Sequence, residues 1–223
     1  MDHRAWLWTG TVVGFALFAL LAIDQVHRGP VYQTDFPVDA ALDRLDATGW
    51  PIHAAGNWMS LPGSPVVDAP LLVAATVLLW RWGQRRLAAW CLGAGALAGL
   101  LNVWLKALFQ RPLPPFIHDR FPDSFAFPSG HTMGAAGTLG IAILLLAEGH
   151  VTRRGLAGPA ASRVRRRAVA VWAGVSLTVG IGRVLAQHHW VSDIPSAWAI
   201  SAGLVCATVL LATRPRARPD ASA

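Results

Sequence analysis

The run LAAWCLGAGALAGLLNVWL, residues 87–105, decides the fold class of this chain. It holds no charged side chain, and its length is close to the roughly 20 residues that an α-helix needs to cross the hydrocarbon core of a bilayer. We therefore predict a membrane-spanning helix here. The run ends at Lys106, the only lysine in a chain that otherwise uses arginine for its positive charges.

Five further apolar runs lead to the same prediction. The six predicted spans are residues 6–23, 66–82, 87–105, 131–147, 168–185 and 194–212. The second span is the weakest, because Asp68 and Pro70 lie in its first turn. The predicted fold class is all-α: a polytopic membrane protein with six transmembrane helices in one bundle. Residues 1–223 are expected to form a single domain, with a short basic tail at residues 213–223.

The composition supports a membrane protein. Hydrophobic residues make up 54% of the chain and charged residues 14%, whereas soluble domains carry about 25% charged residues. The net charge is +7, but the basic residues occur in short stretches between apolar runs, so no nucleic-acid partner is predicted. Cys91 and Cys206 lie inside apolar runs and are interpreted as packing residues.

The distribution of positive charge predicts the orientation. One side of the membrane would carry most of the basic residues: Arg4, Arg81, Arg85, Arg86, Arg153, Arg154, Arg163, Arg165, Arg166, Arg167, Arg214, Arg216 and Arg218. The other side would carry Arg28, Arg44, Lys106, Arg111, Arg120 and Arg183. The richer side is predicted to be cytoplasmic, with both termini inside and the protein in the inner cell membrane. A cleaved signal peptide is disfavoured, because the first run exceeds the roughly 7–15 residues of a signal core and no small-x-small site follows it.

Two polar segments connect the spans. Residues 24–65 include VDAALDRLDA, residues 38–47, whose apolar spacing predicts a short helix lying on the outer surface. Residues 149–167 are basic and rich in glycine and alanine. This second segment is predicted to be flexible and to face anionic lipid headgroups.

Three polar clusters fall at the outer ends of the third, fourth and fifth spans. The first is Lys106 with the following RPLPP. The second is PSGH, residues 128–131, in which Ser129 and Gly130 lie at the N-cap of a helix, a position that binds anions. Gly130 allows an oxyanion to approach the backbone, and His131 projects from the first turn.

The third cluster is GRVLAQHHWVSD, residues 182–193. His189 and Asp193 are four residues apart, so in a helix they share a face and the carboxylate can orient the imidazole. Arg183 can reach the same pocket, whereas His188 has no partner at helical spacing and is interpreted as solvent-exposed. The structural alternatives are a plain capped helix, an interfacial ion pair and a lysine that snorkels to the headgroups.

Taken together, these clusters indicate phosphate chemistry. They offer cations, two histidines, a carboxylate and a helix N-terminus on one face of the membrane. The sequence contains no HExxH motif, no Cys/His quartet and no acidic cluster, so no metal site is predicted. Lys106 is expected to serve a site that needs a compact ammonium group rather than a planar guanidinium.

The clusters resemble the signature of the type 2 phosphatidic acid phosphatase family, which shares its site with the vanadium haloperoxidases. The family pattern is K-x6-R-P, then PSGH, then S-R-x5-H-x3-D. PSGH is complete at residues 128–131, and Arg183, His189 and Asp193 match the third motif. The resemblance covers the chain from about residue 71 to the last span.

The resemblance implies a mechanism. His189 would attack phosphorus and form a phosphohistidine, with Asp193 orienting it and His131 protonating the leaving oxygen. The phosphoryl oxygens would be held by Lys106, Arg183, Ser129 and Gly130. The family needs no metal and no other cofactor.

Two positions depart from the family pattern. Gly182 stands where the family has serine, and Leu113 stands where the first motif has arginine. Arg111 lies two positions earlier, and residues two apart in extended backbone point the same way, roughly 7 Å apart. Arg111 is therefore predicted to bind phosphate in place of the missing arginine.

The expected function is metal-independent hydrolysis of a lipid phosphate on the extracytoplasmic face. Candidate substrates are undecaprenyl pyrophosphate, phosphatidylglycerophosphate, phosphatidic acid and lipid A phosphates, with membrane lipids as the surroundings. Two alternatives stay open: a phosphotransferase that uses the same residues, and a non-catalytic membrane relative, which Leu113 makes conceivable. The sequence leaves the oligomeric state open.

Overall fold

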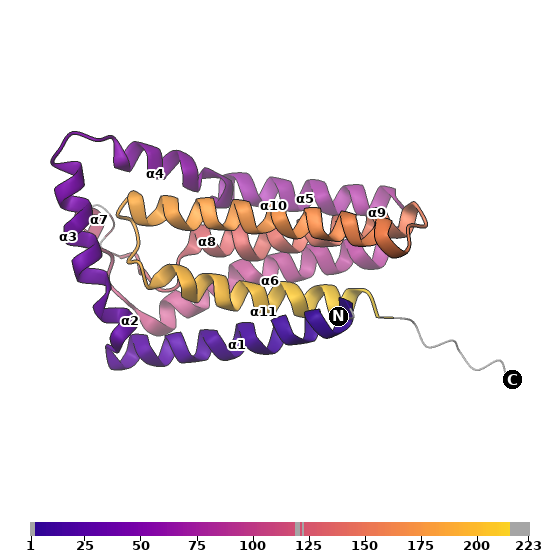
Figure 1. Ribbon diagram of the computed structural model, residues 1–223, viewed down its shortest axis with the longest axis horizontal. Helices are drawn as coiled ribbons and strands as arrows, with labels where there is room; N and C mark the ends of the chain where they lie inside the picture. The colour runs from indigo at the N-terminus through magenta and orange to yellow at the C-terminus, as the bar shows by residue number, and fades with distance from the viewer. Residues whose placement is uncertain (1–2, 119–120, 122, 215–223) are drawn as a thin grey trace, which may run out of the picture.

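The computed structural model describes residues 3–118, 121 and 123–214. Every regular element in these residues is helical (Figure 1). Six helical stretches are long and apolar enough to span a membrane: His3–His27, Ile52–Arg81, Arg85–Phe109, Gly130–Arg153, Gly158–Leu185 and Asp193–Ala212. The predicted all-α fold with six spans is confirmed. Most of the predicted tail, together with Arg120, lies outside the described residues.

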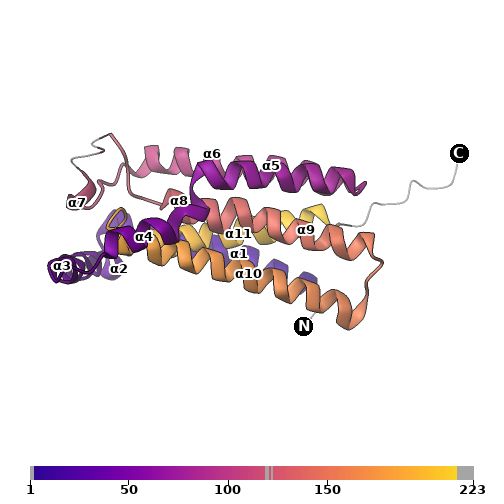
Figure 2. The same ribbon diagram turned by 90° about the horizontal axis from the view of Figure 1, so that it is seen from above.

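The long helices run side by side, with α9 (Leu139–Arg153) in the middle (Figures 1 and 2). α5 (Pro65–Arg81), α6 (Arg85–Phe109) and α11 (Asp193–Ala212) pack around α9. The core between them includes Leu79, Ile141 and Leu145, which are fully buried. Cys91 and Cys206 are free thiols buried in the same core, as predicted.

α1 (His3–His27) packs along α11, so the first and last of the described long helices are neighbours. Leu7 of α1 is buried in the same cluster as Val205 and Cys206 of α11. The rest of α1 is largely uncovered by the protein, with Val12, Val13 and Leu20 exposed. Such a row of exposed apolar side chains is typical of a helix that faces lipid.

The two ends of the bundle differ in charge. The start of α1, the α5–α6 turn, the turn after α9 and the end of α11 lie at one end, and α2 (Pro30–Gln33), α3 (Asp35–Asp46) and α7 (Pro115–His118) lie at the other (Figure 1). The arginine-rich turns therefore all fall at the end away from the three polar clusters. This separation agrees with the charge distribution used to predict the orientation.

The basic segment 149–167 is helical over most of its length, so the prediction of a flexible loop there was wrong. α9 continues to Arg153, and α10 (Gly158–Leu185) begins only a few residues later. Arg165 explains part of this order, because its Nε and Nη2 atoms donate to Glu148 of α9 at 2.8 and 2.9 Å. The ion pair joins the end of α9 to the start of α10.

The outer segment between the first two spans contains more helix than predicted. The helix expected over residues 38–47 forms as α3, and α4 (Ile52–Ser60) follows it. A single turn of 3₁₀-helix, η1 (Leu61–Gly63), joins α4 to α5. α4 packs against α10, and it therefore brings the outer segment into contact with the third polar cluster.

The contact between α4 and α10 depends on two glycines. A Cβ atom on Gly182 of α10 would lie 2.7 Å from the carbonyl oxygen of Gly56 and 2.7 Å from Cβ of Met59. A Cβ atom on Gly56 would in turn lie 2.5 Å from the carbonyl oxygen of Gly182. All three distances are too short for a side chain. Gly182 replaces the family serine because α4 crosses α10 at this point.

Restoring the family serine should therefore destabilise this protein. We expect Gly182→Ser to lower the unfolding midpoint in detergent, because overpacking a tight contact costs about 1–3 kcal/mol. Gly174→Ser, in the middle of the same helix, is the matched control, since a Cβ atom there meets nothing within 4 Å. Equal thermal midpoints for the two variants would show that the crossing tolerates a side chain at Gly182.

Candidate active site

The loop between α10 and α11, residues 186–192, brings His189 against Asp193, the first residue of α11. His189 Nδ1 lies 3.3 Å from Oδ2 of Asp193, and the backbone N–H of Trp190 donates to the same oxygen at 3.0 Å. The carboxylate holds the proton on Nδ1 and leaves the lone pair on Nε2. The structure thus brings together the predicted pair, although His189 lies in a loop and not on the same helix.

The His189 imidazole is held in its neutral form. Its side chain is buried, and the charges of Lys106 and Arg183 lie nearby. Burial, reinforced by these two cations, lowers the pKa of His189 well below its usual value. The side chain is therefore uncharged at neutral pH, which is the form that can act as a nucleophile.

His189 lines a cavity of about 460 Å³ at the end of the bundle where α7 lies. Three of the predicted polar clusters meet there, because Lys106, Gly130, His131 and Arg183 line the same cavity. Apolar residues from the segment after α6 line the cavity as well: Leu113, Ile117, Phe121 and Phe125. A cavity lined by both cations and apolar side chains suits a phosphorylated amphiphile.

Arg183 lines the cavity and, in the described part of the chain, has one buried donor without a partner. Its side chain is buried, and Nη1 donates to Oγ of Ser60 at 3.5 Å. Nε of Arg183 is buried and has no hydrogen-bond partner among the described residues. A buried guanidinium donor without a partner is costly.

Lys106 lies at the last turn of α6, and its Nζ donates to the backbone carbonyl of Phe125. This bond holds the ammonium group at the cavity wall and keeps it from extending along the helix to the membrane surface. The geometry places Lys106 beside Gly130, since a Cβ atom on Gly130 would lie 3.7 Å from Cε of Lys106. The lysine and the helix N-terminus therefore face the same part of the cavity.

Replacing this lysine by arginine should lower turnover although the charge is conserved. We expect Lys106→Arg to reduce kcat about 10- to 100-fold, because a longer planar group cannot keep both the Phe125 contact and the position of a point charge. The reverse exchange Arg85→Lys, at the far end of the bundle, should leave turnover unchanged. Unaltered kinetics in Lys106→Arg would show that Lys106 has no specific role in the site and only extends its charge toward the lipid headgroups.

The PSGH segment forms the N-terminus of a long helical stretch. α8 (Gly130–Met133) continues through the π-helical turn η2 (Gly134–Thr138) into α9. Ser129 is the N-cap, and its Oγ accepts hydrogen bonds from N and Oγ1 of Thr132 at 3.5 and 3.0 Å. Gly130 lines the cavity, but Ser129 is fully buried behind it. The structure places Gly130, and not the Ser129 side chain, where the predicted anion contact would be.

Arg111 lies away from the cavity, and the prediction that it replaces the missing family arginine finds no support in the structure. Gln110 ends α6 with a left-handed backbone, φ 44°, which turns the chain before Arg111. The Arg111 side chain is buried, and its Nη1 donates to Oδ1 of Asp193 at 2.7 Å. Leu113 lines the cavity instead. Arg111 therefore contacts Asp193 through Oδ1, the carboxylate oxygen that does not face His189.

Sequence reasoning missed several cavity residues, and His188 and Asn57 are two of them. His188 lines the cavity beside His131, although it was interpreted as solvent-exposed. Its position next to His189 could have indicated a place in the site. His188 was instead judged by helical spacing, which does not apply within a loop. Asn57 of α4 also lines the cavity. No motif in the polar outer segment marks Asn57.

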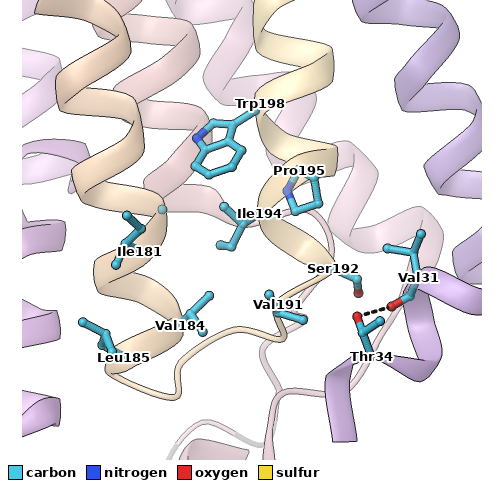
Figure 3. Close-up of a pocket in the computed structure, with 11 residues that line it drawn as sticks. Val31, Thr34, Ile181, Val184, Leu185, Val191, Ser192, Ile194, Pro195 and Trp198 are labelled. Atoms are coloured by element: carbon cyan, nitrogen blue, oxygen red, sulfur yellow. Dashed lines mark hydrogen bonds between the residues drawn. The ribbon is translucent and has the colours of Figure 1, made fainter. Parts of the chain in front are cut away.

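A second cavity, of about 430 Å³, lies on the other face of α10, between α10, α11 and the α2–α3 turn (Figure 3). Its walls are mostly aliphatic, with Trp198 and Pro195 from α11. No charged side chain and no histidine lines it. The chemistry of its walls excludes it as the phosphate site.

The fold and the site define a class: a polytopic helical membrane protein with a histidine–aspartate pair at the wall of a basic cavity. The sequence profile of the PAP2 superfamily matches residues 87–217. This chain belongs to that superfamily. The matched region holds all three polar clusters, from Lys106 to Asp193.

Two comparisons with known proteins agree with this assignment. Phosphatidylglycerophosphatase B of Bacillus subtilis is 32% identical over 95 residues, which is 43% of this chain and 43% of that protein. The alignment thus spans less than half of the relative's length. The crystal structure of a transmembrane PAP2-type phosphatidylglycerolphosphate phosphatase from Bacillus subtilis superposes with a TM-score of 0.71 and 22% identity, covering 88% of this chain and 94% of that one. This similarity shows a shared fold.

Proposed function

We propose that this chain is an integral-membrane lipid-phosphate phosphatase that works through a phosphohistidine on His189 and needs no metal ion. The observation that carries the proposal is the 3.3 Å contact between His189 Nδ1 and Asp193 Oδ2, in a cavity that also presents Lys106 and Arg183. An oriented neutral imidazole is a nucleophile, and fixed cations stabilise the charge that develops on the phosphoryl oxygens. Membership of the PAP2 superfamily supports the same chemistry.

The first half of the reaction transfers the phosphoryl group to the enzyme. Nε2 of His189 attacks phosphorus, so a P–N bond forms while the bond to the lipid oxygen breaks. His131 in its protonated form gives its proton to that leaving oxygen. Lys106, Arg183 and the backbone at Gly130 hold the equatorial oxygens.

The second half releases phosphate. A water molecule gives a proton to His131, now neutral, and attacks phosphorus, so the P–N bond breaks and inorganic phosphate leaves. His131 thus acts as acid in the first half and as base in the second. His189 and His131 return to their initial protonation states.

Phosphatidylglycerophosphate is the first substrate to test, because the Bacillus subtilis relative is named for it. The apolar wall at Leu113 and Ile117 suits the lipid side of such a molecule. Undecaprenyl pyrophosphate, phosphatidic acid and lipid A phosphates are the other candidates. The arginine-rich end of the bundle would face the cytoplasm, which would place the cavity on the extracytoplasmic side.

The test is phosphate release by purified protein in detergent, with EDTA present, against these four lipids. Release that survives EDTA and is lost in His189→Ala would establish a metal-independent histidine phosphatase and identify its preferred lipid. Release that EDTA abolishes would contradict the metal-independent mechanism. No release from any lipid, followed by phosphate transfer when an alcohol acceptor is supplied, would favour a phosphotransferase. No reaction in either assay would favour a non-catalytic relative.

A further inference from the structure

Arg111 is buried between two carboxylates. Its Nη1 donates to Oδ1 of Asp193 at 2.7 Å, and its Nη2 donates to Oδ2 of Asp35. The guanidinium carbon lies 4.8 Å from the ring centre of Tyr32 and 5.4 Å from that of Trp190. The side chain is therefore fixed both in its plane, by hydrogen bonds, and above its plane, by aromatic rings.

Asp35 is the other fixed point of this arrangement. It is the first residue of α3 and is almost completely buried. Its two oxygens accept from the backbone N–H of Ser192 at 2.8 Å and from Oγ of Ser192 at 2.7 Å. Ser192 directs its hydroxyl toward the α2–α3 turn (Figure 3). Asp35 thus ties the outer segment to the residue immediately before Asp193.

Burying Asp35 is unfavourable in itself. Burial raises the pKa of the Asp35 carboxyl, and Arg111 and Ser192 offset this shift only in part. A buried ion pair is weak evidence for a gain in stability, because the desolvation cost can exceed the attraction. The geometry suggests a role other than stability for Asp35. It accepts from Nη2 of Arg111, whereas Asp193 accepts from Nη1.

Each oxygen of Asp193 is then assigned. Oδ1 accepts from Arg111, and Oδ2 accepts from Trp190 and lies against His189 Nδ1. The carboxylate cannot rotate without breaking one of these bonds. Without Asp35, the Arg111 guanidinium would interact with the Asp193 carboxylate alone. Asp193 would then be a weaker hydrogen-bond acceptor for His189 Nδ1–H.

We propose that Asp35 and Arg111 are positioning residues for the reaction at His189. Asp35 orients the Arg111 fork, Arg111 fixes the Asp193 carboxylate, and Asp193 keeps the proton of His189 on Nδ1. This inference rests on the proposed function, because it assigns these residues to the same nucleophile. It links the outer helix α3 to the chemistry through three consecutive contacts.

The first test separates kcat from KM. We expect Asp35→Asn to lower kcat at least about 10-fold while KM changes less than about 3-fold, because neither Asp35 nor Arg111 lines the cavity that binds substrate. Asp43→Asn is the matched control. Asp43 lies two turns further along α3 and accepts from Gln187 at 2.8 Å, a bond that asparagine can keep. A kcat within 2-fold of wild type in folded Asp35→Asn would overturn the inference.

A double-mutant cycle tests whether Asp35 acts through Arg111. Arg111→Lys keeps the charge but removes the fork that bridges the two carboxylates. If the relay exists, Asp35→Asn should have little further effect in the Arg111→Lys background. Independent losses that multiply in the double variant would contradict it. If Asp35→Asn does not fold, Ser192→Ala replaces it, with an expected 3- to 10-fold loss of kcat, and wild-type kcat there would overturn the relay.

A measurement without turnover separates this inference from the proposed function. In protein labelled with ¹⁵N-histidine, the Nδ1–H signal of His189 should be present in wild type and in Asp43→Asn, and shifted or lost in Asp35→Asn. His189→Ala assigns the signal. An unchanged signal in Asp35→Asn would contradict positioning. A wild-type protein without phosphate release would instead contradict the proposed function, and the spectra would still decide the role of Asp35.

Discussion

Replacing His189 by alanine should lower kcat for phosphate release by roughly 10⁴-fold or more, because the proposed reaction loses its nucleophile. The residual rate would come from binding and from the cations of the cavity alone. The wild-type protein, quenched during turnover of a ³²P-labelled lipid, should yield an acid-labile, base-stable phosphoprotein. His189→Ala should yield none.

The matched control for this variant is His27→Ala. His27 is exposed in the last turn of α1, at the same end of the bundle. Its loss should leave both turnover and the phosphoprotein unchanged. A His189→Ala protein that retained more than about a tenth of wild-type kcat would show that the nucleophile is not His189.

Replacing His131 by alanine should lower kcat about 10²- to 10⁴-fold, the usual contribution of general acid–base catalysis. His131 lies in the first turn of α8 and lines the cavity together with His189. Its loss should affect the two halves of the reaction differently. With an aryl phosphate, whose leaving group departs without a proton, the first half should proceed and the second should stall.

The phosphoprotein should therefore accumulate in His131→Ala when 4-nitrophenyl phosphate is the substrate. A burst of nitrophenolate equal to the amount of enzyme, followed by slow release of phosphate, is the expected time course. Steady turnover without a burst, at a rate close to that of wild type, would remove His131 from both steps. The burst should be absent in the double variant that also carries His189→Ala.

The polar clusters could be read from the sequence because each one depends on local spacing. PSGH combines an N-cap serine, a glycine and a first-turn histidine within four residues, and His131 and Gly130 do line the cavity. The spacing of Arg183, His189 and Asp193 was informative for a different reason than expected. His189 and Asp193 meet because the loop turns back on the start of α11, and not because they share one helix.

Arg111 could not be placed from the sequence, because two long-range facts decide its position. The backbone around Pro112 is extended, as assumed, but the left-handed residue Gln110 turns the chain between the end of α6 and Arg111. The partner that holds the side chain, Asp35, is far away in sequence and belongs to a helix whose pattern indicated only a surface position. Buried charge networks of this kind have no sequence period, so only the structure reveals them.

Several predicted spans are shorter than the helices in the structure, and the reason is simpler. Apolar runs mark the part of a helix that lies in hydrocarbon, and the helix continues into the polar region at either end. α10 begins at Gly158, well before the predicted start of the fifth span at residue 168. Arginine-rich ends lower the mean hydropathy of a helix without breaking it, since arginine is a good helix former.

The pairing of α1 with α11 has a consequence for biogenesis. Of the described helices, α1 is inserted first by the translocon, and the helix that packs along it is made last. During synthesis α1 must persist as a separate helix among lipids, which its apolar surface permits. Asp193 opens that last helix. The nascent chain therefore completes its histidine–aspartate pair in the same step that pairs α1 with α11, and incomplete chains released before this point would lack the proposed chemistry.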